Sequence, residues 1–332
     1  MLPETSPVTR EQIRDTAYAF QESRILLSAY ELGLFTALGN GRHTSAGIAS
    51  MLGTDPRATD RLMNALCAMG ILEKGNGRFS NSPAARECLV RDSPGYLGGL
   101  MHTVNLWDTW STLTEAVRRG TSAPLRGVDG RREQWLSAFI AAMHDRAVRQ
   151  APAVVGQFDL SGVTRILDVG GGSGAYAMAF VRAGDGIHAT VFDLPDVLPL
   201  TRAYIEREGL SQKVSTVAGD YLRDGLGKDF DIVFLSAIIH SNSPSENAGL
   251  ILKCAHALRP GGRVVVQDFI MDEERLTPSH GAIFSLNMLV GTVSGDTYTE
   301  AEVSGWMTAA GLSGVSRQGT PFGTSQIAGR LL

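Results

Sequence analysis

A cluster of glycines at residues 170–174 constrains this chain more than any other feature of its sequence. Residues 165–169 before it are predicted to form a strand and residues 175–183 after it a helix. Glycines let backbone N–H groups approach a ligand closely and direct the helix N-terminus at the negative end of that ligand. The segment therefore predicts a cofactor site in an α/β domain. Gly170, Gly172 and Ala175 also fit a dinucleotide fingerprint, so the glycines alone leave the cofactor open.

The C-terminal half alternates between strand-like and helical segments, which predicts a doubly wound parallel sheet. Strands are expected at 165–169, 189–194, 214–218, 231–238 and 263–270, with helices at 175–183, 196–209 and 244–258. The tail differs: two helices, at 279–291 and 299–310, precede extended runs at 315–318 and 326–331. We expect these two runs to complete the sheet as a hairpin.

The N-terminal part is mostly helical. Helices are predicted at 11–38, 44–52 and 55–69, and a hairpin at 71–81 turns at Gly75-Asn76-Gly77, which is the order of a winged-helix unit. A DNA reader needs a basic face, but residues 1–100 hold ten basic and ten acidic residues. We therefore expect this unit to pack against a protein surface, most simply a second copy of itself. A winged-helix regulator that senses a ligand is the alternative.

Composition narrows the class of protein further. The net charge is −4 and 43% of residues are hydrophobic, values that suit a globular chain and predict neither nucleic-acid nor membrane partners. The first residues lack the pattern of a secretory signal. Cys67, Cys88 and Cys254 are far apart and form no metal-binding motif, so we expect no metal and a cytoplasmic location.

Acidic residues at three predicted strand ends distinguish between the possible cofactors. Asp168 precedes the glycine turn, where its charge repels a pyrophosphate but attracts an ammonium or sulfonium group. Asp193 suits ribose hydroxyls, and Gly219-Asp220 offers an acceptor for an adenine amino group. This set favours S-adenosylmethionine over NAD, although an NAD-dependent oxidoreductase remains an alternative. Asp168 and Asp220 can also simply cap helices or turns.

Several motifs together resemble the S-adenosylmethionine-dependent O-methyltransferases with a winged-helix-like dimerisation domain, the caffeate and hydroxyindole type. They are LDVGGGSG at 167–174, FDLPDV at 192–197, GDYL at 219–222, FDIVFLSAIIH at 230–240, LRPGGRVVVQDF at 258–269 and YTEAEVSGWMTAAGL at 298–312. The resemblance implies a Rossmann-like seven-stranded cofactor domain, a homodimer, and methyl transfer to a small, usually aromatic, hydroxyl compound. The expected cofactor-binding residues are Asp168, Gly170, Gly172, Asp193, Leu194, Gly219, Asp220 and Tyr221.

His240 falls where the family carries its general base, and Asp268 aligns with an acid that orients this base. The chain departs from the family twice, with Ser241-Asn242 in place of Asp-Trp and Thr297 in place of a second acid. C-methylation, or a non-methylating reaction with the same cofactor, is therefore the alternative within enzymes.

We expect three segments: a dimerisation domain at 1–95, a helical connector at 96–158 that contributes to the substrate pocket, and the catalytic domain at 159–332. His144 is also a candidate second base. The expected pocket residues are His102, Trp107, Phe139, Met143, His144, Phe284, Asn287 and Met288.

Overall fold

The computed structural model describes residues 7–124 and 132–332. Residues 1–6 and 125–131, which belong to the predicted 1–95 and 96–158 segments, lie outside the described residues. Backbone contacts divide the chain into two units, Met1–Asn105 and Leu106–Leu332, and helix α7 (Leu100–Trp110) spans the division. The three predicted segments, with their boundaries at 95/96 and 158/159, stay predictions.

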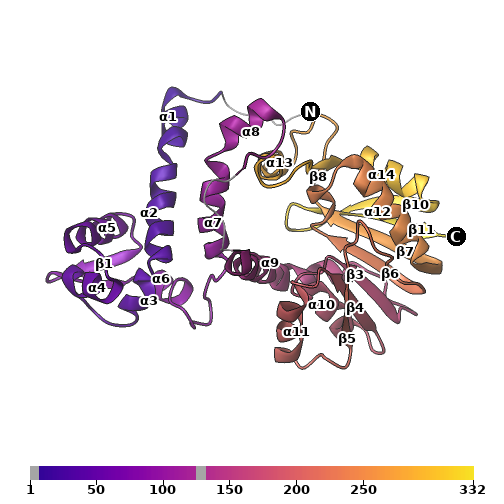
Figure 1. Ribbon diagram of the computed structural model, residues 1–332, viewed down its shortest axis with the longest axis horizontal. Coiled ribbons are helices and arrows are strands. Elements are labelled where there is room, and N and C mark those ends of the chain that lie inside the picture. Colours follow the sequence, from indigo (N-terminus) through magenta and orange to yellow (C-terminus); the bar gives the residue numbers. More distant parts are fainter. Residues whose placement is uncertain (1–6, 125–131) are drawn as a thin grey trace. The chain divides into compact units, whose positions relative to one another are not determined.

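The first unit is mostly helical (Figure 1). Its helices are α1 (Arg10–Tyr18), α2 (Phe20–Glu31), α3 (Leu34–Leu38), α4 (Ser45–Leu52), α5 (Pro56–Ala68) and α6 (Pro83–Cys88), and its strands are β1 (Leu72–Gly75) and β2 (Arg78–Asn81). The single helix expected at 11–38 is wrong, because the chain breaks at Ala19 and again at Gly33, whose left-handed φ of 74° a helix does not accommodate. The hairpin expected at 71–81 is confirmed, with Asn76 and Gly77 both at positive φ in its turn.

The second unit contains the predicted sheet. Its helices are α8 (Leu113–Arg119), α9 (Arg132–Val155), α10 (Ala175–Ala183), α11 (Leu198–Arg207), α12 (Pro244–His256), α13 (Ser279–Gly291) and α14 (Glu300–Ala309). Its strands are β3 (Arg165–Val169), β4 (His188–Asp193), β5 (Val214–Ala218), β6 (Phe230–Ser236), β7 (Leu258–Asp268), β8 (Ile270–Met271), β9 (Tyr298–Thr299), β10 (Leu312–Gly319) and β11 (Ser325–Leu331).

Seven of these strands form one sheet in the order β10-β11-β7-β6-β3-β4-β5. Neighbours from β7 to β5 are parallel, whereas β11 is antiparallel to both β7 and β10, so the expected terminal hairpin is confirmed. From β3 the chain adds β4 and β5 on one side and then β6 and β7 on the other. Ligands of open α/β sheets bind where the strand order reverses in this way, which here is the edge beyond β3 and β6.

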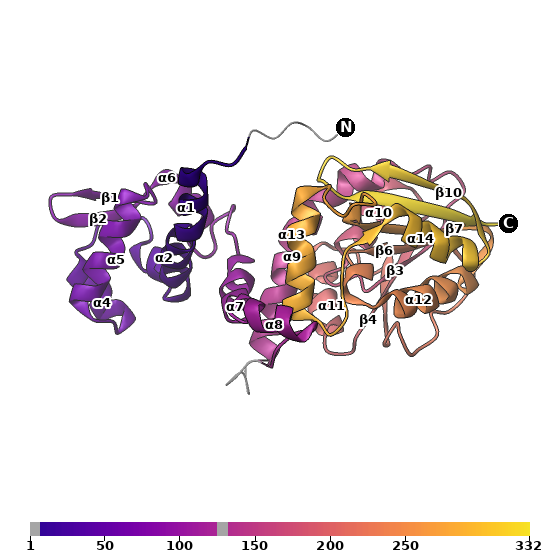
Figure 2. The same ribbon diagram turned by 90° about the horizontal axis from the view of Figure 1, so that it is seen from above.

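Helices cover both faces of the sheet (Figures 1 and 2). Leu167, Val233 and Val264 pack with α12 and α14 on one face, and their chain neighbours pack with α9, α10 and α11 on the other. This alternation along each strand explains why the central strands are apolar at nearly every position. Among the described residues, no helix is both long and apolar enough to cross a membrane.

Candidate active site

The glycine turn joins β3 to α10 and bends sharply towards β4. Gly170 has φ +64° and donates its N–H to the carbonyl of Phe192 at 2.7 Å. A Cβ atom at Gly170 would lie 2.3 Å from Ile238 Cδ1, so a side chain does not fit there. Glycine is therefore required at this position, because the Ile238 side chain packs directly against the backbone of the turn.

Asp168 lies directly beneath this turn and is 1% exposed. Its Oδ2 accepts the N–H of Ala177, in the first turn of α10, at 3.2 Å. Burial raises the pKa of this carboxyl to about 7, against the opposing effect of that hydrogen bond. The side chain thus satisfies an amide at the N-terminus of α10, as the capping interpretation expects. Its contact with the cofactor stays a prediction.

Asp193 ends β4 and joins two parts of the expected cofactor site. Its Oδ2 accepts the N–H of Gly172 at 2.8 Å, and its Oδ1 accepts the N–H of Leu194 at 2.7 Å. The carbonyl of Asp193 accepts the N–H of Gly219 at 3.0 Å. Burial raises the pKa of the Asp193 carboxyl, while the two amide donors oppose the shift. A carboxylate has about four acceptor positions, so this one retains capacity for a ligand.

Asp220 and Tyr221 follow β5 and face different neighbours. Asp220 Oδ1 accepts the N–H of Leu222 at 2.9 Å, as in an Asx turn. The hydroxyl of Tyr221 donates to Asn242 Oδ1 at 3.2 Å. Burial raises the pKa of Tyr221 to about 12, so its hydroxyl keeps its proton and remains a donor. Tyr221 therefore connects the loop after β5 to the segment that contains His240.

His240 and Asp268 form the expected pair. Both carboxylate oxygens of Asp268 lie 2.9 Å from His240 Nδ1, and the His240 and Asp268 side chains are 12% and 3% exposed. Because a carboxylate accepts hydrogen bonds, the proton of a neutral His240 lies on Nδ1. Nε2 then has the free lone pair and is the nitrogen that can accept a proton from a ligand.

His240 lies beyond the end of β6, and this strand is two residues shorter at its end than the predicted strand at 231–238. Strand β6 stops at Ser236 because Ala237 adopts a left-handed φ of 58° and donates its N–H to the carbonyl of Gln267. A short 3₁₀ helix, Ile239–Ser241, follows and contains His240. The imidazole is therefore positioned by a turn and not by the sheet itself.

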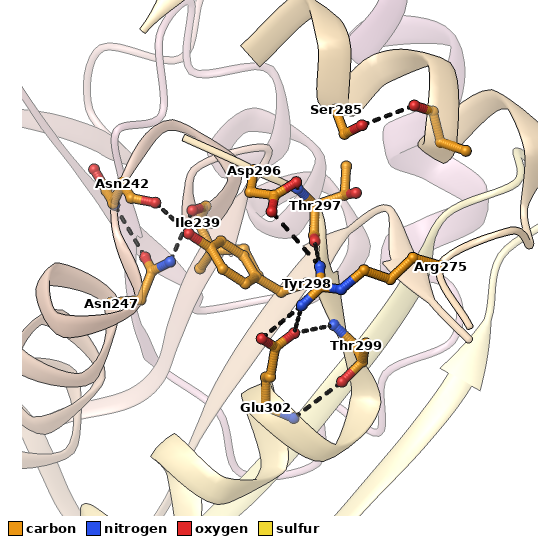
Figure 3. Close-up of polar contacts among 11 residues, drawn as sticks. Ile239, Asn242, Asn247, Arg275, Ser285, Asp296, Thr297, Tyr298, Thr299 and Glu302 are labelled. Atoms are coloured by element: carbon orange, nitrogen blue, oxygen red, sulfur yellow. Dashed lines mark hydrogen bonds and ion pairs between the residues drawn. The ribbon is translucent and has the colours of Figure 1, made fainter. Parts of the chain in front are cut away.

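Buried polar groups hold this turn in place (Figure 3). Asn247 Nδ2 donates to the carbonyl of Ile239 at 2.8 Å, and Asn242 Nδ2 donates to Asn247 Oδ1 at 3.1 Å. The Tyr298 hydroxyl donates to the carbonyl of Asn242. Burial and then the nearby carboxylates of Asp296 and Glu302 raise the pKa of Tyr298 to about 12, which keeps this donor protonated. Asn242 is thus a hydrogen-bonding centre of the turn.

Thr297 is buried beside Tyr298, in the segment leading to β9. Its N–H donates to Asp296 Oδ1 at 2.7 Å, and its carbonyl accepts from Arg275. Arg275 also binds both oxygens of Glu302, at 2.7 and 2.8 Å (Figure 3). This segment passes close over the turn, because a Cβ atom at Gly295 would lie 2.3 Å from the carbonyl oxygen of His240. Arg275 and Glu302 therefore support the segment that supports His240.

An aromatic ring of α13 packs against the imidazole, and a second ring packs behind it. The Phe284 ring meets His240 edge-on with centroids 4.8 Å apart, and Phe269 lies 5.0 Å from Phe284. Asn287 Oδ1 accepts the indole N–H of Trp110 at 2.9 Å, which joins α13 to α7. The structure thus brings Phe284 to His240 and gives Asn287 a protein partner.

The other expected pocket residues are more scattered. Met288 is buried on α13, and Phe139 stacks on Trp135 along α9, where Met143 is half-buried. Trp107 lies on α7 in the second unit, and His102 lies on the same helix in the first unit. Their role in a substrate pocket stays a prediction.

His144 faces the glycine turn. Its Nδ1 lies 2.9 Å from Ser173 Oγ, and its Nε2 lies 3.3 Å from an Arg207 amino group, which can only donate. Nε2 is therefore the acceptor, and Nδ1–H donates to Ser173. The imidazole also stacks on the Tyr204 ring, with the two ring centroids 3.9 Å apart. Burial, and to a smaller extent the positive charge of Arg207, lowers the pKa of His144. Both nitrogens have protein partners, and a role as second base stays a prediction.

Sequence reasoning missed the groups that hold the His240 turn and the aromatic contacts of Phe269. No local signal identifies them, because Asn247 lies within a helix and Tyr298 begins a two-residue strand. Within residues 7–124 and 132–332, no group of three or more His, Cys, Asp or Glu side chains has an arrangement that could hold a metal ion.

Comparison with known proteins agrees with this site. A family model described as the O-methyltransferase domain matches residues 110–313, and one described as the O-methyltransferase dimerisation domain matches residues 15–91. The chain is 35% identical over 330 residues to 3-hydroxy-5-methyl-1-naphthoate 3-O-methyltransferase of Streptomyces sahachiroi, covering 96% of this chain and 94% of that protein. It is 32% identical to the tetracenomycin polyketide synthesis 8-O-methyl transferase of Streptomyces glaucescens, covering 95% of each chain.

Solved structures show the same relationship. PigF with SAH superposes with a TM-score of 0.90 at 26% identity, covering 97% of this chain and all of that one. These matches define a class I S-adenosylmethionine-dependent methyltransferase. The chain belongs to the O-methyltransferase family with an N-terminal dimerisation domain. The glycine motif alone did not identify the cofactor, and the comparisons identify it as S-adenosylmethionine. The expected enzyme class and α/β fold are confirmed.

The Tyr298 hydroxyl provides a direct test of how the turn is held. We expect Tyr298→Phe to leave the Asn242 carbonyl without its donor, lowering the free energy of unfolding by about 1–3 kcal/mol and reducing kcat. Urea unfolding and steady-state kinetics measure the two effects. Ser316→Ala, which removes a hydroxyl at an exposed position on β10, is the control and should change neither. Equal stability and kcat for Tyr298→Phe and wild type would contradict this account.

Proposed function

We propose that this protein transfers a methyl group from S-adenosylmethionine to a hydroxyl of a small aromatic, polyketide-type acceptor, with His240 as the general base. The observation that supports this role is the hydrogen bond of His240 Nδ1 with Asp268, beside the edge where the strand order reverses. The naphthoate and tetracenomycin O-methyltransferases, at 35% and 32% identity, support an acceptor of this class.

The chemistry requires removal of a proton from the acceptor oxygen. A phenol with a pKa near 10 is mostly protonated at neutral pH, so a base in contact with it makes the oxygen nucleophilic. We assign this step to His240 Nε2. Asp268 fixes the tautomer and stabilises the imidazolium that forms, which makes it a positioning residue. Phe284, against the imidazole edge, restricts the ring to this orientation and excludes water from one side.

The residues of the glycine turn and the strand ends fit the cofactor. When bound, S-adenosylmethionine supplies an electrophilic methyl group on a positively charged sulfur. The turn at Gly170 presents backbone without side chains, and the Asp193 carboxylate retains acceptor capacity for ribose hydroxyls. Asp168 adds negative charge beneath the turn when it is ionised. We assign the adenine side to Asp220 and Tyr221.

The roles of His240 as base and of Asp268 as its positioning residue can be tested by mutation. We expect His240→Ala to lower kcat by about 10²–10⁴-fold while the affinity for S-adenosylhomocysteine changes little. Asp268→Asn should lower kcat as well, because an amide can no longer stabilise the imidazolium. Mass spectrometry of product formation measures turnover, and His256→Ala, on the exposed side of α12, is the control. Unchanged turnover in His240→Ala would move the base elsewhere, and a methyl group on carbon would favour the C-methylation alternative.

The cofactor assignment is tested by binding alone. We expect wild-type protein to bind S-adenosylhomocysteine in calorimetry and Asp193→Asn to weaken binding by about tenfold or more, because hydrogen bonds to a charged acceptor contribute about 1.5–3 kcal/mol each. Asp196→Asn, an exposed neighbour in the same loop, is the control and should bind like wild type. Equal affinities in both variants would contradict the role of Asp193.

We further infer a homodimer formed through the first unit. The dimerisation-domain match covers residues 15–91, and α1 exposes apolar side chains that a monomer would leave in water. Ile13 is 62% exposed, Tyr18 58%, and Phe20, at the start of α2, 54%. A second copy of this chain is the partner that would cover them. A winged-helix-like origin of this unit and a cytoplasmic location, with all three cysteines free, belong to the same proposal.

Charges placed on this surface should separate the two copies. We expect the double variant Ile13→Asp, Phe20→Asp to elute as a monomer, because burying two carboxylates against a symmetric copy is unfavourable. Light scattering coupled to size-exclusion chromatography measures the mass. Leu252→Asp, an exposed apolar position on α12 in the second unit, is the control and should remain dimeric. A dimeric double variant would exclude α1 from the interface.

A further inference from the structure

An arginine packs against the aromatic residues that lead to the proposed base and has no carboxylate partner among the described residues. Arg146 is half-buried on α9, and its guanidinium lies over the ring of Phe269, with Cζ 5.3 Å from the ring centroid. Within the described parts of the chain, no Asp or Glu side chain forms an ion pair with it. A half-buried cation that is stabilised only by an aromatic face is incompletely compensated.

Two ring contacts connect Arg146 to His240. Phe269 directly follows Asp268, and its ring lies 5.0 Å from that of Phe284, which lies 4.8 Å from the His240 imidazole. All of these residues belong to the second unit. Arg146, Phe269, Phe284 and His240 therefore form one continuous series of contacts.

The same edge contains a further polar group without a complete set of partners. Gln267 precedes Asp268 on β7 and donates from Nε2 to the hydroxyl of Tyr176 at 3.1 Å. Its buried Oε1 has no hydrogen-bond partner among the described residues. Burial raises the pKa of Tyr176, while its hydrogen bonds and then the Arg146 charge oppose the shift, so Arg146 and Tyr176 interact electrostatically. One buried acceptor in this region, Gln267 Oε1, is thus left without a partner among the described residues.

Stacking on an aromatic ring occupies only the face of a guanidinium. Its N–H donors lie in the plane of the group and remain available, in a geometry that matches a carboxylate bidentately. The partner that such a cation lacks is an anion with two coplanar oxygens. The charge, the position and the open donors of Arg146 together define what it would bind.

We propose that Arg146 binds a carboxylate of the acceptor, so that the preferred acceptors are aromatic hydroxy acids. This inference rests on the proposed function, because it assumes that the acceptor occupies the side of His240 and Phe284. The cofactor has a carboxylate too, but its sugar and base are assigned to Asp193, Asp220 and Tyr221, on the strands β4 and β5, on the other side of β3 from β7. The experiment therefore separates the two sources of a carboxylate.

Calorimetry with the full-length protein saturated with S-adenosylhomocysteine provides the test. The probes are 3-hydroxy-1-naphthoate and its carboxamide, which differ in charge but hardly in shape. We expect wild type to bind the acid about tenfold or more tightly than the amide, and Arg146→Met to reduce this preference to less than about twofold. Arg146→Lys should retain part of this preference, since an ammonium keeps the positive charge but lacks the paired, coplanar N–H donors of a guanidinium. Arg149→Met, exposed on the same helix, is the control and should retain all of it.

Two results would overturn the proposal. One is equal binding of acid and amide to wild type, including no binding of either. The other is an Arg146→Met variant that loses affinity for S-adenosylhomocysteine but not for 5′-methylthioadenosine, which lacks the amino-acid carboxylate, because Arg146 would then bind the cofactor. Failure of wild type to bind S-adenosylhomocysteine at all would instead refute the proposed function. Circular dichroism of each variant confirms that it is folded.

Discussion

Hydrogen bonding between parallel strands is the constraint on which the proposed site depends. Strands β3, β4, β6 and β7 are held in register by their neighbours, so their carboxyl ends meet at one edge of the sheet. The glycine turn, Asp193, the His240 turn and Asp268 all leave the sheet at this edge. The β3 turn and the β6 turn then approach so closely that Gly170 has no room for a Cβ atom beside the Ile238 side chain. The same closeness would bring a cofactor and a base together.

The orientation of the His240 imidazole depends on residues that do not contact it but hold its turn in place. His240 lies in a 3₁₀ turn, and a turn without support would leave the imidazole free to rotate away from Asp268. Asn247, Tyr298 and Asn242 supply that support through buried hydrogen bonds, which are stronger where water is excluded. Where the resemblance predicts Asp-Trp, this chain has Ser241-Asn242, and Asn242 belongs to a network of polar contacts. Through Tyr221, this network also connects the turn to the loop assigned to adenine.

Local sequence predicts the parts of this site that depend on neighbouring residues. The strand, glycine turn and helix around Gly170 follow from periodicity and glycine content, and the terminal hairpin follows from its alternating runs. The end of β6 does not, because residues 230–240 are apolar almost throughout and only the left-handed Ala237 stops the strand. For Asp168 the sequence predicts a capping role as one alternative, but not that the capped amide is that of Ala177, nine residues further along the chain. The contacts of Tyr298 and Arg146 join residues more than fifty positions apart, beyond the reach of any local pattern.

The charges around the site also favour different positions for its two proposed ligands, the cationic cofactor and the anionic acceptor. Carboxylates dominate the side of the glycine turn, where Asp168 and Asp193 have raised pKa values because burial makes their negative charge costly. A cationic sulfonium relieves that cost, so binding it and ionising these carboxyls favour each other. Arg146 provides the opposite charge on the side of Phe269, where an anionic acceptor would relieve the cost of a half-buried guanidinium. Each proposed ligand thus brings the charge that its own side of the site lacks, and exchanging the two positions would place like charges together.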